Sequence, residues 1–257
     1  MNILVLVKAV PLVGDERLDE QWQTDRTSLE ANGADEYCLE KALQLTEASG
    51  GQVSVLSVGP ASASEALRKA LAMGAERAYH VVDDGLAGSD IRATVAVLAA
   101  ACRKIEFDLV FSGADSSDGQ GGVVGAALAV HLDLPYLSNA ADVELVDGGS
   151  VRVKRLNASG HDILEASLPA LIMGTQLLGE PRYPSLRGIM AARKKETVTL
   201  SLADLGIEPA FVGAAAATTA VSAAEMPAGR GGATVIQAEP DEAVRQVMSL
   251  LSDRGLV

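Results

Sequence analysis

The chain of 257 residues has few of the residue types that build disulfide-bonded, zinc-binding or membrane proteins. Its two cysteines, Cys38 and Cys102, lie far apart without CxxC or CxxH spacing, which excludes a disulfide framework and gives no zinc signature. No apolar stretch approaches the roughly 20 residues that a bilayer span needs. The chain also starts without a basic region or cleavage signal, so we expect no export, no membrane insertion and a cytoplasmic location.

Positive charge is also scarce. The sequence has 21 Lys and Arg against 34 Asp and Glu, a formal net charge of −13. Such a chain repels phosphate backbones and anionic lipids, so neither nucleic acid nor a membrane surface is an expected partner. Because 48% of the residues are apolar, a sizeable core is available for one large α/β domain or two small ones.

Patterns that carry out catalysis are missing as well. The three histidines, His80, His131 and His161, are scattered, and no serine or cysteine stands in a nucleophile elbow. We therefore expect a protein without catalytic residues of its own rather than an enzyme.

Short apolar runs alternate with longer stretches in which apolar residues return every three or four positions. The runs predict strands at 3–7, 52–58, 78–82, 107–112 and 170–174, and the stretches predict helices at 34–49, 62–73, 89–104 and 122–132. This alternation predicts an α/β fold with a doubly wound, mostly parallel sheet, whose ligands bind beyond the carboxyl ends of the strands.

Two segments depart from the alternation. Residues 141–168 read as an antiparallel hairpin extension, with Asp147, Gly148 and Gly149 as a turn. After Ile207 the composition turns to Ala, Gly, Thr and Pro before a last amphipathic stretch at 241–254. We expect a nucleotide-binding core at 1–190 and a C-terminal extension at 191–257, whose arm packs on another surface or is a disordered tail.

The segment SGADSSDGQGG follows a predicted strand and opens a helix, so its backbone N–H groups and the helix dipole could hold a phosphate. It is neither a Walker A loop nor a Rossmann GxGxxG, and a tight connection capped by Asp118 and Ser116 is the alternative. Residues 114–125 include no Lys or Arg, so we expect no cation paired with the phosphate. Lys8 to Pro11 and Asn32 to Asp35 should lie at the same edge, although Lys8 alone reads more often as a solvated end.

A third segment, EPRYPSLRGIMAARKKE from Glu180 to Glu196, combines exposed-looking apolar residues with three consecutive cations in an acidic chain. Composition allows a basic patch that docks an acidic partner, or a solvated helix end. The order of residues resembles the EPRY…L…IM…KK stretch of electron transfer flavoprotein β-subunits. ILVLVKAVP, NGADEYCLEKAL and VLSVGPASASEALRKALAMGAERAYHV continue that resemblance over about residues 2–207.

The resemblance implies an adenine-nucleotide-hydrolase-like fold in a heterodimer with an α-subunit that holds the redox-active FAD. The arm of the C-terminal extension at 191–257 would then pack on that α-subunit. It also implies an AMP of structural role in the β-subunit. The matching segments place that nucleotide against Leu6, Asn32, Gly33, Ala34, Asp35, Val58, Gly113, Ala114, Asp115, Ser116, Ser117, Asp118, Gly119, Gln120, Gly121, Gly122, Val123 and Val124.

The resemblance further implies that electrons pass from acyl-CoA dehydrogenase-type flavoenzymes to a quinone oxidoreductase or the respiratory chain. Leu186 matches the hydrophobic anchor that enters a pocket on the partner dehydrogenase. The implied docking residues are Tyr183, Leu186, Ile189, Met190, Arg193, Lys194 and Lys195.

The nucleotide loop departs from the family. AMP-holding members read about DDDxNQTG and electron-bifurcating members, in which a second FAD replaces AMP, about DGDTAQVG; this chain reads DGQGGVVG. Asp118 and Gly119 resemble the bifurcating form, whereas Val123 replaces a Gln and Gly121 a Thr or Cys. We expect AMP, with a second FAD as the alternative. Two rivals from other classes are a stand-alone adenine-nucleotide sensor of the universal-stress type and an enzyme that adenylates a substrate.

Overall fold

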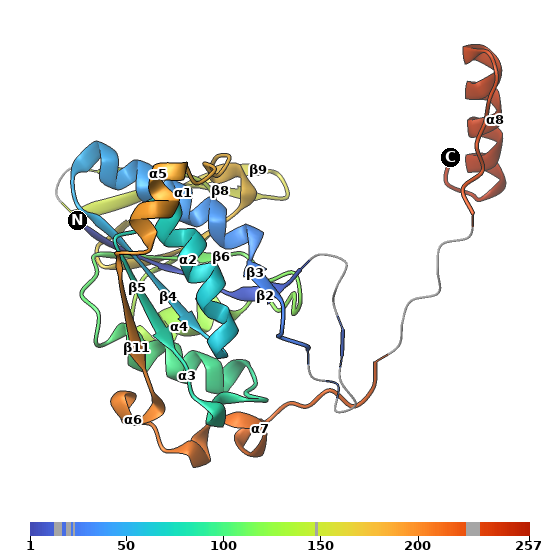
Figure 1. The fold of residues 1–257 in the computed structure, drawn as a ribbon. Coiled ribbons are helices and arrows are strands. Elements are labelled where there is room, and N and C mark those ends of the chain that lie inside the picture. The colour runs from blue at the N-terminus through green and yellow to red at the C-terminus, as the bar shows by residue number, and fades with distance from the viewer. Residues whose placement is uncertain (13–16, 19–21, 23, 147–148, 225–231) are drawn as a thin grey trace. The chain divides into compact units, whose positions relative to one another are not determined.

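The computed structural model describes residues 1–12, 17–18, 22, 24–146, 149–224 and 232–257. They divide into two units, residues 1–222 and 223–257, which we treat separately. Figure 1 labels most of the helices and strands of the first unit.

A nine-stranded sheet in the order β11-β5-β4-β1-β6-β10-β7-β8-β9 forms the centre of the first unit. All pairings from β11 to β7 are parallel, and β8 and β9 add antiparallel strands at one edge. The strands of this sheet are β1 (Asn2–Leu6), β4 (Gln52–Val58), β5 (Arg77–Val81), β6 (Leu109–Gly113), β7 (Tyr136–Val146), β8 (Ser150–Asn157), β9 (Gly160–Ser167), β10 (Ala170–Gly174) and β11 (Glu196–Leu200).

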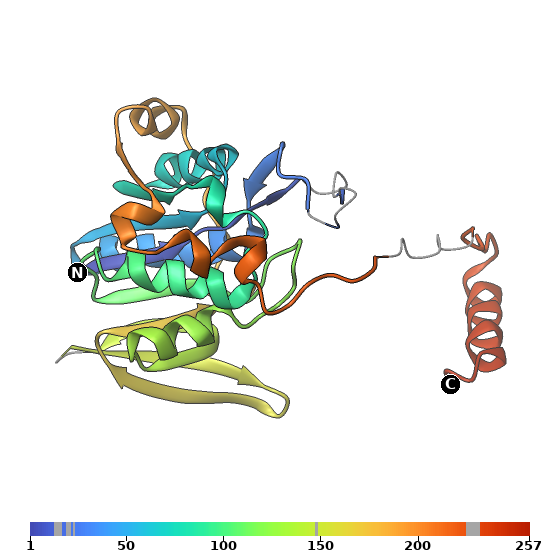
Figure 2. The same ribbon diagram turned by 90° about the horizontal axis from the view of Figure 1, so that it is seen from below.

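Helices cover both faces of this sheet, as its central strands β1, β4, β6 and β10, which are mostly buried, require. The helices are α1 (Gly33–Ser49), α2 (Ser64–Met73), α3 (Ile91–Cys102), α4 (Val124–Leu132), α5 (Leu186–Ala192), α6 (Leu202–Leu205) and α7 (Gly213–Ala216). One core lies under α1 and α2, and a second lies under α3 and α4. Figure 2 shows these layers, with α5 outside α2. The doubly wound α/β fold predicted from the sequence is confirmed.

The antiparallel extension is larger than the predicted hairpin at 141–168. It has three strands, and β7 begins at Tyr136 rather than after residue 140. The first part of β7 lies inside the parallel sheet, where Leu137 pairs with Ile172 of β10, so the sequence texture changes only halfway along this strand. Of the expected turn, residues 147 and 148 lie outside the described part of the chain.

The first unit extends well beyond residue 190, where the sequence suggested that the core ends. The strand β11 pairs in parallel with β5 and so completes the sheet edge. The following chain then attaches to the loop before α3: Gly213 N donates to Ser89 Oγ at 2.8 Å, and Thr218 N donates to Asp90 Oδ2 at 2.7 Å. Asp90 also caps α3 through Ala93 N, at 3.0 Å. Residues 191–222 therefore belong with the sheet.

The second unit contains one helix, α8 (Pro240–Asp253), close to the amphipathic stretch predicted at 241–254. None of its residues is buried, and one side carries exposed apolar residues: Val244, Val247, Met248 and Leu250. Among the described residues of the whole chain, no helix combines the length and apolar character that crossing a bilayer demands.

Candidate nucleotide site and docking segment

The carboxyl ends of β1, β4 and β6 form one edge of the sheet, because the three strands are parallel and in close register. Leu6, buried at the end of β1, pairs with Leu56, two residues before the half-buried Val58. Gly113 ends β6 at the same level. The structure therefore places the three predicted strand-end residues at one edge.

Two side chains at the start of α1 join this edge to the glycine-rich loop. The amide of Asn32 donates from Nδ2 to the carbonyl of Asp115 at 2.8 Å and accepts from Ser117 N at 3.3 Å. Asn32 therefore orders the loop instead of capping its own helix. The carboxylate of Asp35 accepts from Lys8 N at 2.8 Å and from Gly113 N at 3.1 Å.

Asp35 is the most perturbed carboxyl of the site. Burial disfavours its charged form and raises its pKa to about 7, against the opposing effect of the N–H groups of Lys8 and Gly113 and the amide of Asn32. Asp35 is therefore about half-ionised near neutral pH, and its carboxylate accepts from backbone N–H groups at the ends of two strands. Protonation of Asp35 is thus coupled to the position of these strand ends.

The loop is also tied to two cations that come from elsewhere in the sequence. Lys8 Nζ donates to Ser116 Oγ at 2.9 Å and to Asp118 Oδ1 at 2.6 Å, and Arg26 donates to Asp118 Oδ2 at 2.9 Å. Only 4% of the Asp118 side chain is exposed. Burial opposes ionisation of Asp118, but the hydrogen bonds from Lys8 and Ser116 and the nearby charges outweigh it and lower its pKa.

These contacts correct two expectations from the sequence. Lys8 is not a free solvated end, and the loop is not without cations. Lys8 reaches the loop from between β1 and β2 (Ala9–Pro11), and Arg26 reaches it from the chain before β3 (Leu29–Ala31), which pairs with β2 in a small two-stranded sheet. Arg26 is fixed there by its bond to the carbonyl of Ala9 at 3.1 Å. Arg26 lies outside the regular elements and meets Asp118 across 92 positions of the sequence, so no local sequence signal identifies it.

Beyond Asp118 the loop offers mainly backbone groups. Gln120 adopts φ 44° and Gly122 φ 63°, a left-handed stretch that leads into α4, whose N-cap Val123 provides no side-chain cap. The first-turn N–H groups of α4 are therefore open to an anion. The remaining predicted residues are half-buried or exposed around this edge: Gly33, Ala34, Ala114, Gly119, Gly121 and Val124.

The chemistry of this edge fits a phosphate-bearing nucleotide. It combines an uncapped helix N-terminus, glycines that let the backbone approach closely, and the cations Lys8 and Arg26 beside the loop. The Ser112 hydroxyl is buried without a partner among the described residues and lies against Gly125 of the same helix. An unsatisfied polar atom at a helix N-terminus is consistent with a binding site.

The segment 180–196 lies on the other side of α1 and α2 from the sheet. Ser185 caps α5 by accepting from Gly188 N at 3.0 Å. From this short helix and its approach, Tyr183, Leu186 and Met190 project with exposed fractions of 91%, 81% and 70%, and Ile189 with 44%. The structure thus groups the predicted apolar docking residues on one exposed element.

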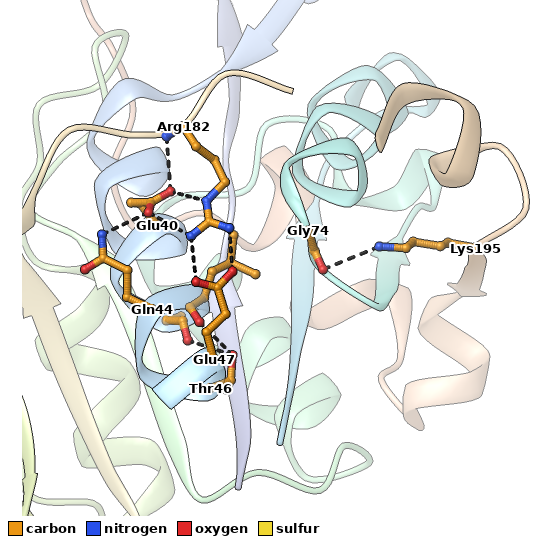
Figure 3. A network of polar contacts seen from close by, with 9 residues as sticks. Glu40, Gln44, Thr46, Glu47, Gly74, Arg182 and Lys195 are labelled. Atoms are coloured by element: carbon orange, nitrogen blue, oxygen red, sulfur yellow. Dashed lines mark hydrogen bonds and ion pairs between the residues drawn. The ribbon is translucent and has the colours of Figure 1, made fainter. Parts of the chain in front are cut away.

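The cations of this segment have different surroundings. Lys195 is half-buried and donates from Nζ to the carbonyls of Leu71, Gly74 and Ala75 at the end of α2, at 3.2, 3.4 and 2.7 Å. It therefore caps a helix, whereas Arg193 and Lys194 are exposed. Arg182, which the sequence analysis did not select, binds Glu40 and Glu47 on α1 (Figure 3). Acidic residues on a helix read as a solvated face, so nothing local indicated this contact.

The chain is similar to known proteins along nearly its whole length. The family model described as the electron transfer flavoprotein domain matches residues 22–205. A protein of Mycobacterium tuberculosis named electron transfer flavoprotein subunit beta is 43% identical over 91% of this chain and 92% of its own length. The protein of the same name from Thermoanaerobacterium thermosaccharolyticum is 36% identical over the full length of both chains.

A third relative has a different name. The Caffeyl-CoA reductase-Etf complex subunit CarD of Acetobacterium woodii is 32% identical over the full length of both chains. The family model covers well over half of the chain, and the relatives match nearly all of it. The chain therefore belongs to the electron transfer flavoprotein β-subunit family.

Proposed function

We propose that this chain is the β-subunit of a heterodimer that carries electrons from acyl-CoA dehydrogenase-type flavoenzymes to a quinone oxidoreductase or the respiratory chain. The FAD, held mainly by the α-subunit at the subunit interface, supplies the electron-accepting and electron-donating chemistry when it is bound. The role of this chain is to assemble with the α-subunit and to dock the donor.

The observation that carries this proposal is the segment 180–196, which we call the docking segment. The side chains of Tyr183, Leu186 and Met190 in this segment are each at least 70% exposed. The chain belongs to a family of electron carriers, which must meet redox partners. Leu186 stands at the start of α5 as the anchor, and burying one such side chain in a partner is worth about 1.5–3 kcal/mol. The exposed Arg193 and Lys194 add attraction for an acidic partner.

The second unit supports assembly with an α-subunit. The apolar side of α8 includes Val244, Val247 and Met248, and no residue of this helix is buried within the described part of its own unit. An amphipathic helix with its apolar side uncovered binds a partner surface. We assign the α-subunit as that partner because the resemblance implies that the C-terminal arm packs on this subunit.

For the edge beyond β1, β4 and β6 we propose AMP as the bound nucleotide. The open N-terminus of α4, together with Lys8 and Arg26, suits a single phosphate, and Asn32 orders the loop around it. The alternative is a second FAD, as in electron-bifurcating relatives, with the same residues holding its phosphates.

The experiment is to purify the chain with its α-subunit and to release and identify the bound nucleotides by chromatography. The proposal expects a yellow complex with one FAD and one AMP, reduced by an acyl-CoA dehydrogenase in the presence of its acyl-CoA. If the complex instead releases two FAD per heterodimer and no AMP, the second nucleotide is FAD. A colourless chain that binds ATP without any α-subunit would refute the proposal and favour the stand-alone sensor.

A further inference from the structure

A network of charged side chains holds the start of the docking segment on α1. Glu40 and Glu47 are seven residues apart on the helix and so face the same side, toward Arg182. The guanidinium donates to Glu40 through Nε at 2.7 Å and Nη2 at 2.9 Å, and to Glu47 through Nη1 at 2.5 Å and Nη2 at 3.1 Å. The backbone N–H of Arg182 adds a bond to Glu40 at 3.1 Å (Figure 3).

The chemistry of this contact is specific to arginine. The planar guanidinium donates two hydrogen bonds to each carboxylate, a bidentate arrangement that a lysine could not reproduce. The hydrogen bonds that Arg182 donates to Glu40 and then to Glu47 raise the pKa of Arg182, which keeps its charge. Only 6% of the Glu40 side chain is exposed; its burial opposes ionisation, but the hydrogen bonds from Arg182 outweigh this and lower its pKa. The contact therefore requires all three charges.

A second contact holds the far end of the segment. The ammonium of Lys195 donates to one carbonyl in the last turn of α2 and to two carbonyls just after the helix, so its three N–H bonds meet three acceptors. Lys195 is followed directly by β11. The chain between Arg182 and Lys195 is thus fixed at both ends to different helices.

The middle of the segment rests on α2. Gly188 of α5 lies against the carbonyl of Ala72 so closely that a Cβ would not fit, and Ala192 is buried. This close packing turns the other side of α5, with Leu186 and Met190, away from the molecule. The apolar side chains therefore project from an element that is supported from below and attached at both ends.

We propose that Arg182, through Glu40 and Glu47, is a positioning residue that presents the docking segment to the dehydrogenase in its bound conformation. This inference rests on the proposed docking function. A segment ordered in advance loses less conformational entropy on binding, so the contact with Arg182 contributes to affinity without touching the partner.

The test uses the assembled heterodimer with FAD bound and an acyl-CoA dehydrogenase with its acyl-CoA as the reductant. Arg182→Gln should raise the KM for the flavoprotein about 10-fold with kcat changed less than about 2-fold, since ordering is lost but the flavin is untouched. Amide hydrogen exchange in residues 183–192 should be at least about 10-fold faster, while α1 exchanges as before.

Two further variants separate positioning from direct contact. Glu40→Gln keeps Arg182 and alters only a buried group, so it should also raise the KM if Arg182 acts by positioning, and leave it unchanged if Arg182 touches the partner. The matched control is Arg152→Gln, which removes one charge from an exposed ion pair with Glu165 and should leave KM and exchange unchanged. If Arg182→Gln does not assemble, Glu47→Gln takes its place, because 57% of the Glu47 side chain is exposed.

The outcomes distinguish this inference from the proposed function. If Leu186→Ala raises the KM but Arg182→Gln and Glu40→Gln change neither KM nor exchange, the positioning role is overturned and the docking function stands. If the dehydrogenase does not reduce even the unmodified heterodimer, the docking function fails. Hydrogen exchange then still decides whether Arg182 orders residues 183–192.

Discussion

Replacing Asp35 by asparagine should change how the stability of this protein depends on pH. The carboxyl is buried and its pKa is raised to about 7 from an ordinary value of 3.8. Between these two values the folded state binds more protons than the unfolded state, so stability from this group is complete below about pH 4 and is lost as the pH rises through 7. Asparagine cannot titrate, and the variant should lose this dependence.

The size of the effect follows from the two pKa values. From pH 5 to pH 8 the wild-type protein should lose about 2.5 kcal/mol of unfolding free energy relative to Asp35→Asn. This corresponds to a shift of roughly 1 M in the urea midpoint. The carboxyls whose pKa is lowered, Glu40 and Asp118, act in a lower pH range: their contributions are lost only as the pH falls below about 4.5. They therefore do not obscure the difference above pH 5.

The assay is urea unfolding of both proteins at several pH values between 5 and 8, with the carboxyl carbon of Asp35 followed by NMR. Asp115→Asn, an exposed carboxylate of the neighbouring loop, is the control and should run parallel to the wild type. Parallel curves for Asp35→Asn as well would refute the reasoning. They would mean that the N–H groups of Lys8 and Gly113 outweigh burial and keep this carboxyl ionised throughout.

The remaining predictions concern three other positions. Leu186→Ala should leave stability within about 0.5 kcal/mol but raise the KM of a dehydrogenase for the heterodimer about 10-fold or more, and an unchanged KM would exclude Leu186 as the anchor. Lys8→Met removes a cation bonded to Asp118, so the complex should retain the second nucleotide about 10-fold less tightly, with unchanged flavin content. Chromatography of the released nucleotides checks this, and equal retention would contradict it. Asp90→Ala removes the N-cap of α3 and the acceptor for Thr218, which should cost about 1 kcal/mol and speed hydrogen exchange in residues 213–219. Unchanged exchange there would show that Asp90 does not hold this segment.

The sequence predicts the elements whose signals are local. The bounds of β4 and β10 match the predicted ones, and those of β1, β5, α1 and α8 differ by at most one residue at either end, because continuous apolar runs and helical periodicity are strong there. The glycine-rich loop is found for the same reason, since its composition marks a strand-to-helix connection. The strand β11 is not predicted from the sequence, because it lies at an edge of the sheet and its residues, in which Thr and Val alternate, are largely exposed.

The contacts that shape the candidate sites could not be predicted from the sequence, because they join residues far apart in it. Arg182 meets Glu40 across 142 positions and Arg26 meets Asp118 across 92, and no local pattern of either partner specifies the other. Lys195 illustrates the same limit. Three consecutive cations suggest one patch, but only the position of the end of α2 decides that the third cation turns inward and caps it.

The course of the chain between β10 and β11 has a consequence for the whole first unit. In the sheet, β10 and β11 are separated by β6, β1, β4 and β5, so the docking segment crosses over α1 and α2 to reach the far edge. This segment acts as a strap: it is bonded to α1 through Arg182 and to the end of α2 through Lys195, and it leads into β11 at the edge of the sheet. A partner bound to this strap would hold it down, so docking should raise the melting temperature and slow the exchange of the β5–β11 amides, although the partner touches neither strand.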